Sequence, residues 1–122
     1  MILLDTNIVI GYLAGDAEII SAVDKAVLEF GSIALSTINV VELFGYQKLE
    51  EEERQQLHRF IDCAMLIHLT PELAMRAAEV RRTHRLTTTD AVIAATALTQ
   101  DELLVSRDQD FKKVSGLKLL VP

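Results

Sequence analysis

The sequence predicts an α/β fold, a three-layer α/β/α sandwich in which helices cover both faces of a parallel sheet. Short apolar runs alternate along the chain with segments of helical spacing. In the first four runs apolar residues follow one another without alternation, which is typical of strands buried on both faces. The chain has 122 residues, half of them apolar. This is enough for one core, so we expect residues 1–122 to form a single domain.

Five runs are the candidate strands: 2–4, 33–35, 65–67, 103–105 and 117–121. Between them, helical spacing is clearest over 17–30, with Asp16 as a cap, and over 72–85, where Pro71 suits the first helical position after a Thr70 cap. A further helix is expected from Thr87 or Thr88 to about Thr99. The acidic run 50–53 is typical of the first turn of another helix.

The composition excludes several classes of protein. Asp and Glu outnumber Lys and Arg by 18 to 12, giving a net charge of −6, which argues against binding nucleic acid through excess basic charge alone. Cys63 is the only cysteine, which excludes an intramolecular disulfide, and we expect it in the core. No apolar run is long enough to span a membrane and the N-terminus does not read as a signal peptide, so we expect a cytoplasmic protein.

Acidic residues follow two of the predicted strands. Asp5 comes directly after the first, and Asp108 follows the fourth in Ser106-Arg107-Asp108. Each has an ordinary alternative role, as a helix cap or in a turn. In folds of this class, however, ligands bind at the carboxyl ends of the strands. Two acids at such ends therefore indicate a candidate site.

Two further acids stand in predominantly apolar helical segments. Glu42 lies in 38–46, which is apolar nearly all round, so we expect a buried helix in which this carboxylate is paired, protonated or bound to a cation. Asp90 lies in the segment 87–98, on the same side as Ala94 and Ala97. Its alternative role is in a capping box with Thr87.

Four converging carboxylates would repel one another unless a cation neutralised them. Hard divalent ions such as Mg²⁺ and Mn²⁺ prefer oxygen ligands, whereas zinc sites commonly use His or Cys. Two such ions in one site activate water and stabilise the leaving oxygen of a phosphodiester. The pattern therefore indicates phosphodiester hydrolysis with Mg²⁺ or Mn²⁺, two ions per site.

Four segments together resemble the PIN-domain nucleases, most closely the short VapC-type toxins of toxin–antitoxin pairs: LLDTNIVIGYL, STINVVELFGY, TTTDAVIAATAL and LLVSRDQDFKKVSGLKLL. The resemblance covers essentially the whole chain. It implies a five-stranded parallel sheet and a metal-dependent endoribonuclease acting on tRNA or another structured RNA. It also implies a cognate antitoxin as partner and a homodimer.

By position, the resemblance assigns the catalytic, metal-binding acids to Asp5, Glu42, Asp90 and Asp108. The expected supporting polar groups are Thr6 or Asn7, and Ser106. Asp110, two residues beyond Asp108, is the alternative fourth acid. Candidate contacts to substrate phosphate are Arg107, Arg82 and Arg85, the alternative for the helical arginines being a solvated helix face.

Two other functions remain open at this point. A non-catalytic PIN-like module would bind protein or RNA without metal. A phosphatase with Asp5 as nucleophile would ordinarily carry a second Asp two residues later, where this chain has Asn7. Two bound divalent ions would offset four of the six net negative charges, so the acidic composition is compatible with an RNA substrate.

Overall fold

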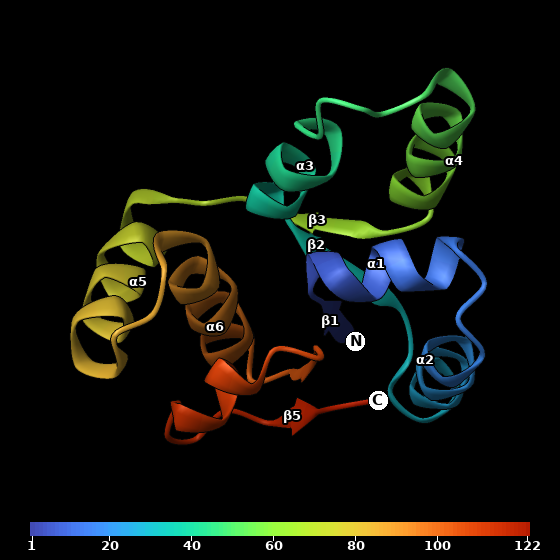
Figure 1. Cartoon of the computed structure of the whole chain (residues 1–122). Coiled ribbons are helices and arrows are strands. Elements are labelled where there is room, and N and C mark those ends of the chain that lie inside the picture. The colour runs from blue at the N-terminus through green and yellow to red at the C-terminus, as the bar shows by residue number, and fades with distance from the viewer.

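The computed structural model describes all 122 residues and contains one five-stranded, fully parallel sheet (Figure 1). The strands are short: β1 (Ile2–Leu4), β2 (Ile33–Ser36), β3 (Met65–Ile67), β4 (Leu103–Val105) and β5 (Leu119–Leu120). Their spatial order is β3-β2-β1-β4-β5, so β1 lies at the centre and pairs with β2 on one side and β4 on the other. The predicted α/β fold with a parallel sheet is confirmed.

Six helices and one 3₁₀ turn connect the strands: α1 (Thr6–Leu13), α2 (Ala17–Phe30), α3 (Thr37–Phe44), α4 (Glu51–Asp62), α5 (Pro71–His84), α6 (Thr88–Gln100) and η1 (Gln109–Lys113). In Figure 1, α5 and α6 lie together on one side of the sheet, and α1 and α2 lie on the other. The predicted helix starts are confirmed for α2, α5 and α6. Asp16, Thr70 and Thr87 cap these three helices by accepting hydrogen bonds from main-chain N–H groups of the first turn.

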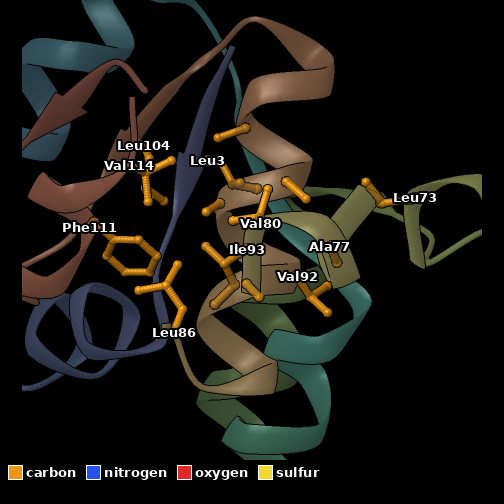
Figure 2. Packing of buried hydrophobic residues seen from close by; sticks show 14 of the residues in the cluster. Leu3, Leu73, Ala77, Val80, Leu86, Val92, Ile93, Leu104, Phe111 and Val114 are labelled. Atoms are coloured by element: carbon orange, nitrogen blue, oxygen red, sulfur yellow. The ribbon is translucent and has the colours of Figure 1, made fainter. Parts of the chain in front are cut away.

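The two faces of the sheet have separate apolar cores, because alternate side chains of one strand point to opposite faces. Leu3 joins the cluster under α5 and α6, whereas Ile2 and Leu4 join the cluster under α1 and α2. Figure 2 shows the first cluster, in which Ile93 of α6 and Phe111 of η1 are both almost fully buried. Since β1 is buried on both faces, its continuous apolar run needs no alternation.

The edges of the sheet differ from the sequence prediction. β3 is an edge strand, and its Met65 is 54% exposed, so the expectation that this run is buried on both faces is wrong. The predicted strand over 117–121 is reduced to Leu119–Leu120 at the opposite edge. Cys63, expected in the core, is exposed after the last turn of α4. An apolar run by itself does not distinguish a central strand from an edge strand.

The strand order reverses direction beside β1. The chain passes from β1 outward to β2 and β3, then returns to place β4 and β5 on the other side of β1. Such a switch point leaves a crevice at the carboxyl ends of the central strands. Here α1, α3 and the loop after β4 all begin. No helix combines the length and apolar character needed to cross a membrane.

Candidate metal-binding active site

Asp5 is the buried centre of the site. It follows β1, caps α1 and is only 5% exposed. Its Oδ1 accepts a hydrogen bond from the Thr6 main-chain N–H (2.8 Å). Its Oδ2 accepts from Ser106 Oγ (2.7 Å) and Asn7 Nδ2 (3.2 Å). The structure thus brings Asn7 and Ser106, two of the expected supporting groups, onto one carboxylate, and the capping role of Asp5 coexists with its place in the site.

Glu42 lies on α3 and is exposed, which corrects the prediction that an apolar helix would bury it. The helix buries Asn39 and Leu43, whereas Val41, next to Glu42, remains 66% exposed. Glu42 Oε1 accepts a hydrogen bond from Thr6 Oγ1 (2.6 Å). The Glu42 charge is also close enough to raise the pKa of Asp5.

Asn39 is a site residue that sequence reasoning missed. Its side chain is fully buried and spans two strand ends, because Oδ1 accepts from the Ser36 main-chain N–H (2.9 Å) and Nδ2 donates to Thr6 Oγ1 (3.0 Å). Thr6 in turn donates to Glu42. Asn39 therefore orients the hydroxyl that holds Glu42. The available signal was Ser36 followed three residues later by a polar side chain in an apolar helix, a capping-box spacing.

Asp90, Asp108 and Asp110 form the third part of the site. One carboxylate oxygen from each lies within 4.8 Å of the others. Asp90 is half-buried in the first turn of α6, where Thr87 Oγ1 accepts from the Asp90 main-chain N–H (3.2 Å). Asp108 caps η1 and accepts from the Asp110 main-chain N–H (2.9 Å). Both candidates for the fourth acid are thus close to Asp90, and Asp110 is the more exposed of the two.

The carboxyl groups influence one another electrostatically. Burial, and then the charges of Asp108 and Asp5, raise the pKa of Asp90 to about 6. The pKa of Asp5 is also raised, first by burial and then by Glu42 and Asp108, although the hydrogen bonds from Ser106 and Thr6 oppose the shift. All four acids predicted from the sequence therefore share one electrostatic environment.

This donor set suits a hard divalent cation. Its ligand atoms are carboxylate oxygens, which Mg²⁺ and Mn²⁺ prefer. Packing several carboxylates together is unfavourable until a cation neutralises them, as the raised pKa values indicate. The residues present therefore fit the metal that the sequence predicts.

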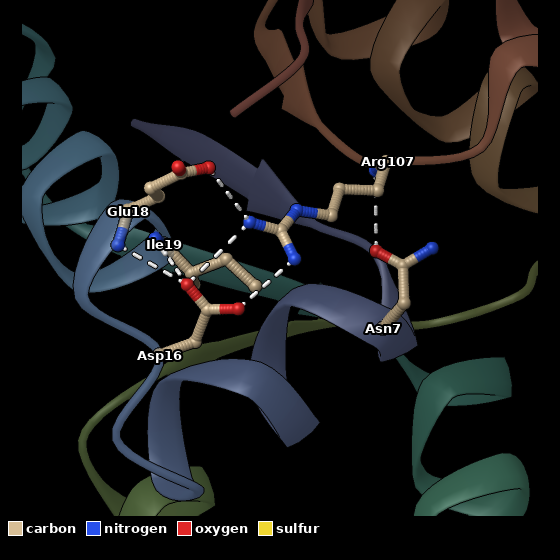
Figure 3. A network of polar contacts seen from close by, with 5 residues as sticks. All are labelled: Asn7, Asp16, Glu18, Ile19 and Arg107. Atoms are coloured by element: carbon tan, nitrogen blue, oxygen red, sulfur yellow. Dashed lines mark hydrogen bonds and ion pairs between the residues drawn. The ribbon is translucent and has the colours of Figure 1, made fainter.

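The three arginines considered as phosphate contacts have different surroundings. The Arg107 guanidinium faces Asp16 and Glu18, as Figure 3 shows. Arg82 is exposed in the last turn of α5, and Arg85 follows this helix with a left-handed backbone (φ 54°). Arg85 stands two residues before the Thr87 cap of α6, the helix that carries Asp90. Asp16, predicted only as the cap of α2, also pairs with Arg107.

A comparison with family models matches the PIN domain over residues 2–117. The chain belongs to the PIN domain family. This confirms the family resemblance seen in the four sequence segments. A sequence search of curated proteins gave no match.

Solved structures of toxin–antitoxin proteins share the fold over nearly the full chain. A toxin–antitoxin complex from Klebsiella pneumoniae is 26% identical, with a TM-score of 0.80, covering 98% of this chain and 96% of that one. VapBC2 from Rickettsia felis, bound to a promoter DNA fragment, has a TM-score of 0.83 at 21% identity and covers 100% and 99%. VapBC-1 from nontypeable Haemophilus influenzae has a TM-score of 0.79 at 21% identity and covers 99% and 98%.

Proposed function

We propose that this PIN domain protein is a Mg²⁺- or Mn²⁺-dependent endoribonuclease and the toxin of a VapBC-type toxin–antitoxin pair, its 122 residues forming one nuclease domain. The observation that carries the proposal is the proximity of acidic side chains at this crevice: carboxylate oxygens of Asp90, Asp108 and Asp110 lie within 4.8 Å of one another, and the charges of Glu42 and Asp108 raise the pKa of Asp5. Family membership and the similarity to toxin–antitoxin complexes support it.

Asp5, Glu42, Asp90 and Asp108 are the residues that would hold the metal, with Asp110 as an additional or alternative ligand. Two divalent ions held there would activate a water molecule for attack on a phosphodiester and stabilise its leaving oxygen. The protein's own part is preorganisation. Ser106, Asn7 and the Thr6 main chain hold Asp5, while Asn39 and Thr6 hold Glu42, so neither carboxylate needs to reorganise when the ion and RNA bind.

RNA cleavage with and without EDTA tests the proposed chemistry. Purified protein with Mn²⁺ should cleave at least one of several structured RNAs, tRNA included, and EDTA should abolish the cleavage. Asp5→Asn should lower the rate by about 10³-fold, the scale expected when a preorganised charged group is lost from a reaction centre. Absence of EDTA-sensitive cleavage across the RNA panel would contradict the proposal.

The control is Asp62→Asn, which removes one negative charge at an exposed position in the last turn of α4. This variant should cleave RNA at the wild-type rate. Circular dichroism on both variants separates loss of chemistry from loss of fold. Calorimetric titration with Mn²⁺ separates the enzyme from a non-catalytic PIN-like binding module, for which no heat of binding is expected.

A groove beside Glu42 supports the antitoxin partner. It has a volume of about 440 Å³ and lies between α1, α3 and α4, with Ile10, Tyr46 and Leu49 among its apolar lining and Glu42 and Glu53 at its acidic positions. A segment with apolar and basic side chains would fit this lining and cover the acidic site.

Toxicity on expression tests the toxin–antitoxin assignment. Expression of the protein should be toxic, and co-expression of a short neighbouring gene should relieve the toxicity, as should Asp5→Asn. Toxicity that persists in Asp5→Asn would contradict this assignment.

Two finer proposals concern RNA and self-association. Arg82 and Arg85 are candidate phosphate contacts, so Arg85→Gln should raise KM for RNA more than it lowers kcat.

A homodimer would cover apolar side chains that are exposed in the single chain, namely Val41, Met65, Leu69 and Met75. Light scattering that gives the mass of one chain, with no concentration dependence, would contradict the homodimer.

A further inference from the structure

Arg107 lies in sequence between two site residues, but its guanidinium pairs with none of the proposed metal ligands. Its neighbours Ser106 and Asp108 both belong to the site, and Ser106 Oγ accepts from the Asp108 main-chain N–H (3.0 Å). The Arg107 guanidinium instead donates to both carboxylate oxygens of Asp16 (2.9 and 3.4 Å) and to Glu18 Oε2 (3.3 Å) (Figure 3). The loop after β4 is thereby tied to the start of α2, 91 residues away in sequence.

Asp16 is a well-anchored partner for this arginine. It caps α2, with Oδ1 accepting from the main-chain N–H groups of Glu18 (3.1 Å) and Ile19 (3.2 Å). These hydrogen bonds, together with Arg107, lower the pKa of Asp16, which therefore remains ionised at neutral pH. A bidentate contact between a planar guanidinium and a carboxylate fixes the relative orientation of the two groups as well as the distance between them.

The main chain of Arg107 continues the connection into the site. Its N–H donates to Asn7 Oδ1 (3.3 Å), and Asn7 Nδ2 donates to Asp5 Oδ2. The same Asp5 oxygen accepts from Ser106 Oγ. The loop that carries Asp108 thus contacts Asp5 on one side and Asp16 on the other.

We propose that Asp16 and Arg107 form a clamp that positions the 106–108 loop, and so sets Asp108 relative to Asp5 for metal binding. The inference rests on the proposed metal site. It makes both members positioning residues, and it assigns Arg107 a role other than contact with substrate phosphate. The two roles make opposite predictions for Asp16: loss of a clamp partner weakens metal binding, whereas loss of a competing carboxylate frees Arg107 for RNA.

The test measures Mn²⁺ affinity, by the electron paramagnetic resonance signal of free Mn²⁺, in Asp16→Asn, Arg107→Gln and the double variant. Asn is as good a helix cap as Asp, so the first variant removes the charge while keeping α2 capped. Each single variant should bind Mn²⁺ about 10- to 100-fold more weakly, the range found when a residue supporting a metal ligand is lost. The double variant should be no weaker than the worse single variant, because the two residues act through one contact.

Cleavage assays provide a second readout. For Asp16→Asn, the Mn²⁺ concentration giving half-maximal cleavage should rise, while kcat at saturating Mn²⁺ and KM for RNA stay near wild type. Arg107→Lys, which keeps the charge without the planar fork, should lie between wild type and Arg107→Gln. Glu29→Gln, at an exposed position of α2, the helix that Asp16 caps, is the matched control and should behave as the wild type in every measurement.

Wild-type Mn²⁺ affinity in Asp16→Asn would overturn the clamp, as would an Arg107→Gln variant that changes only KM for RNA. Additive losses in the double variant would also overturn it. The proposed function fails separately, if Asp5→Asn binds Mn²⁺ as tightly as wild type. Thermal denaturation of every variant identifies any loss of affinity that follows from unfolding.

Discussion

The apolar core under α5 and α6 and the carboxyl edge of the sheet differ in the kind of side chain that they bury. The core cluster contains 15 buried residues, all of them hydrophobic. At the edge, four polar residues are buried: Asp5, Ser36, Asn39 and Ser106. None of the molecule's buried side-chain polar atoms lacks a hydrogen-bond partner.

This difference indicates that the two regions contribute differently to stability and to function. Residues of the core contribute through volume and shape, so any well-packed apolar set of the same size would serve. Residues of the edge need specific partners, and the charges of Asp5 and Asp90 are unfavourable in the metal-free protein, as their raised pKa values indicate. Substitutions in the core should therefore change mainly the free energy of unfolding, whereas substitutions at the edge should change metal binding and cleavage whether or not they also change stability.

Phe111→Ala is expected to have the largest effect on stability. The Phe111 ring is 1% exposed and packs in the cluster under α5 and α6 (Figure 2). Its truncation should lower the free energy of unfolding by about 3–5 kcal/mol, through lost burial and the cavity left behind. Urea denaturation measures this change. A loss below about 1 kcal/mol would mean that η1 is not part of the core.

Asn39→Ala tests whether the edge depends on its hydrogen bonds. The substitution removes the partners of the Ser36 main-chain N–H and of Thr6 Oγ1, so the free energy of unfolding should fall by about 1–3 kcal/mol. Cleavage should fall as well, since Thr6 would no longer be held toward Glu42. Gln47→Ala, at an exposed position, is the control. Unchanged stability and cleavage in Asn39→Ala would contradict the orienting role.

Asp90→Asn should stabilise the metal-free protein. The pKa of Asp90 is about 6 in the folded state against 3.8 for an ordinary Asp, so the folded state holds this proton more tightly. The free energy of unfolding should consequently fall as pH rises from about 4 to about 6 and stay low above that. After allowance for solvent screening of a half-buried group, we expect a gain of about 1 kcal/mol in Asp90→Asn at neutral pH, or about 3 °C in Tm.

Thermal denaturation in EDTA between acidic and neutral pH measures this effect. The wild-type protein should lose stability across the window, and Asp90→Asn should lose less. Mn²⁺ at neutral pH should raise the Tm of the wild type more than that of the variant, because the cation offsets the same repulsion. Parallel pH profiles for the two proteins would show that the Asp90 charge is not a source of instability.

Glu42→Gln is expected to change stability least, by under about 0.5 kcal/mol, because Glu42 is exposed. Cleavage with Mn²⁺ should nevertheless fall strongly, since the amide is a poorer ligand than the carboxylate. Of the variants proposed, Glu42→Gln should therefore show the clearest loss of cleavage without a loss of stability. Full cleavage activity in Glu42→Gln would remove this acid from the proposed site.

Local rules predict much of this fold from the sequence. Asp16, Thr70 and Thr87 mark helix starts through their capping hydrogen bonds, which involve only residues a few positions away. The central strands are recognisable because burial on both faces demands uninterrupted apolar residues. The same reasoning failed at Glu42 and Met65, where exposure depends on which neighbours the element acquires and not on its own composition.

Residues close together in the sequence were sufficient to predict the central strands, three helix starts, the PIN domain family and the four acids to consider. The long-range contacts were not predictable in this way: Ser106 donates to Asp5 across 101 positions, Asn39 reaches Thr6, and Arg107 pairs with Asp16. These contacts follow from the strand order. Placing β4 against β1 brings Asp5 and Ser106 together at one crevice, and no local pattern of residues encodes such a pairing.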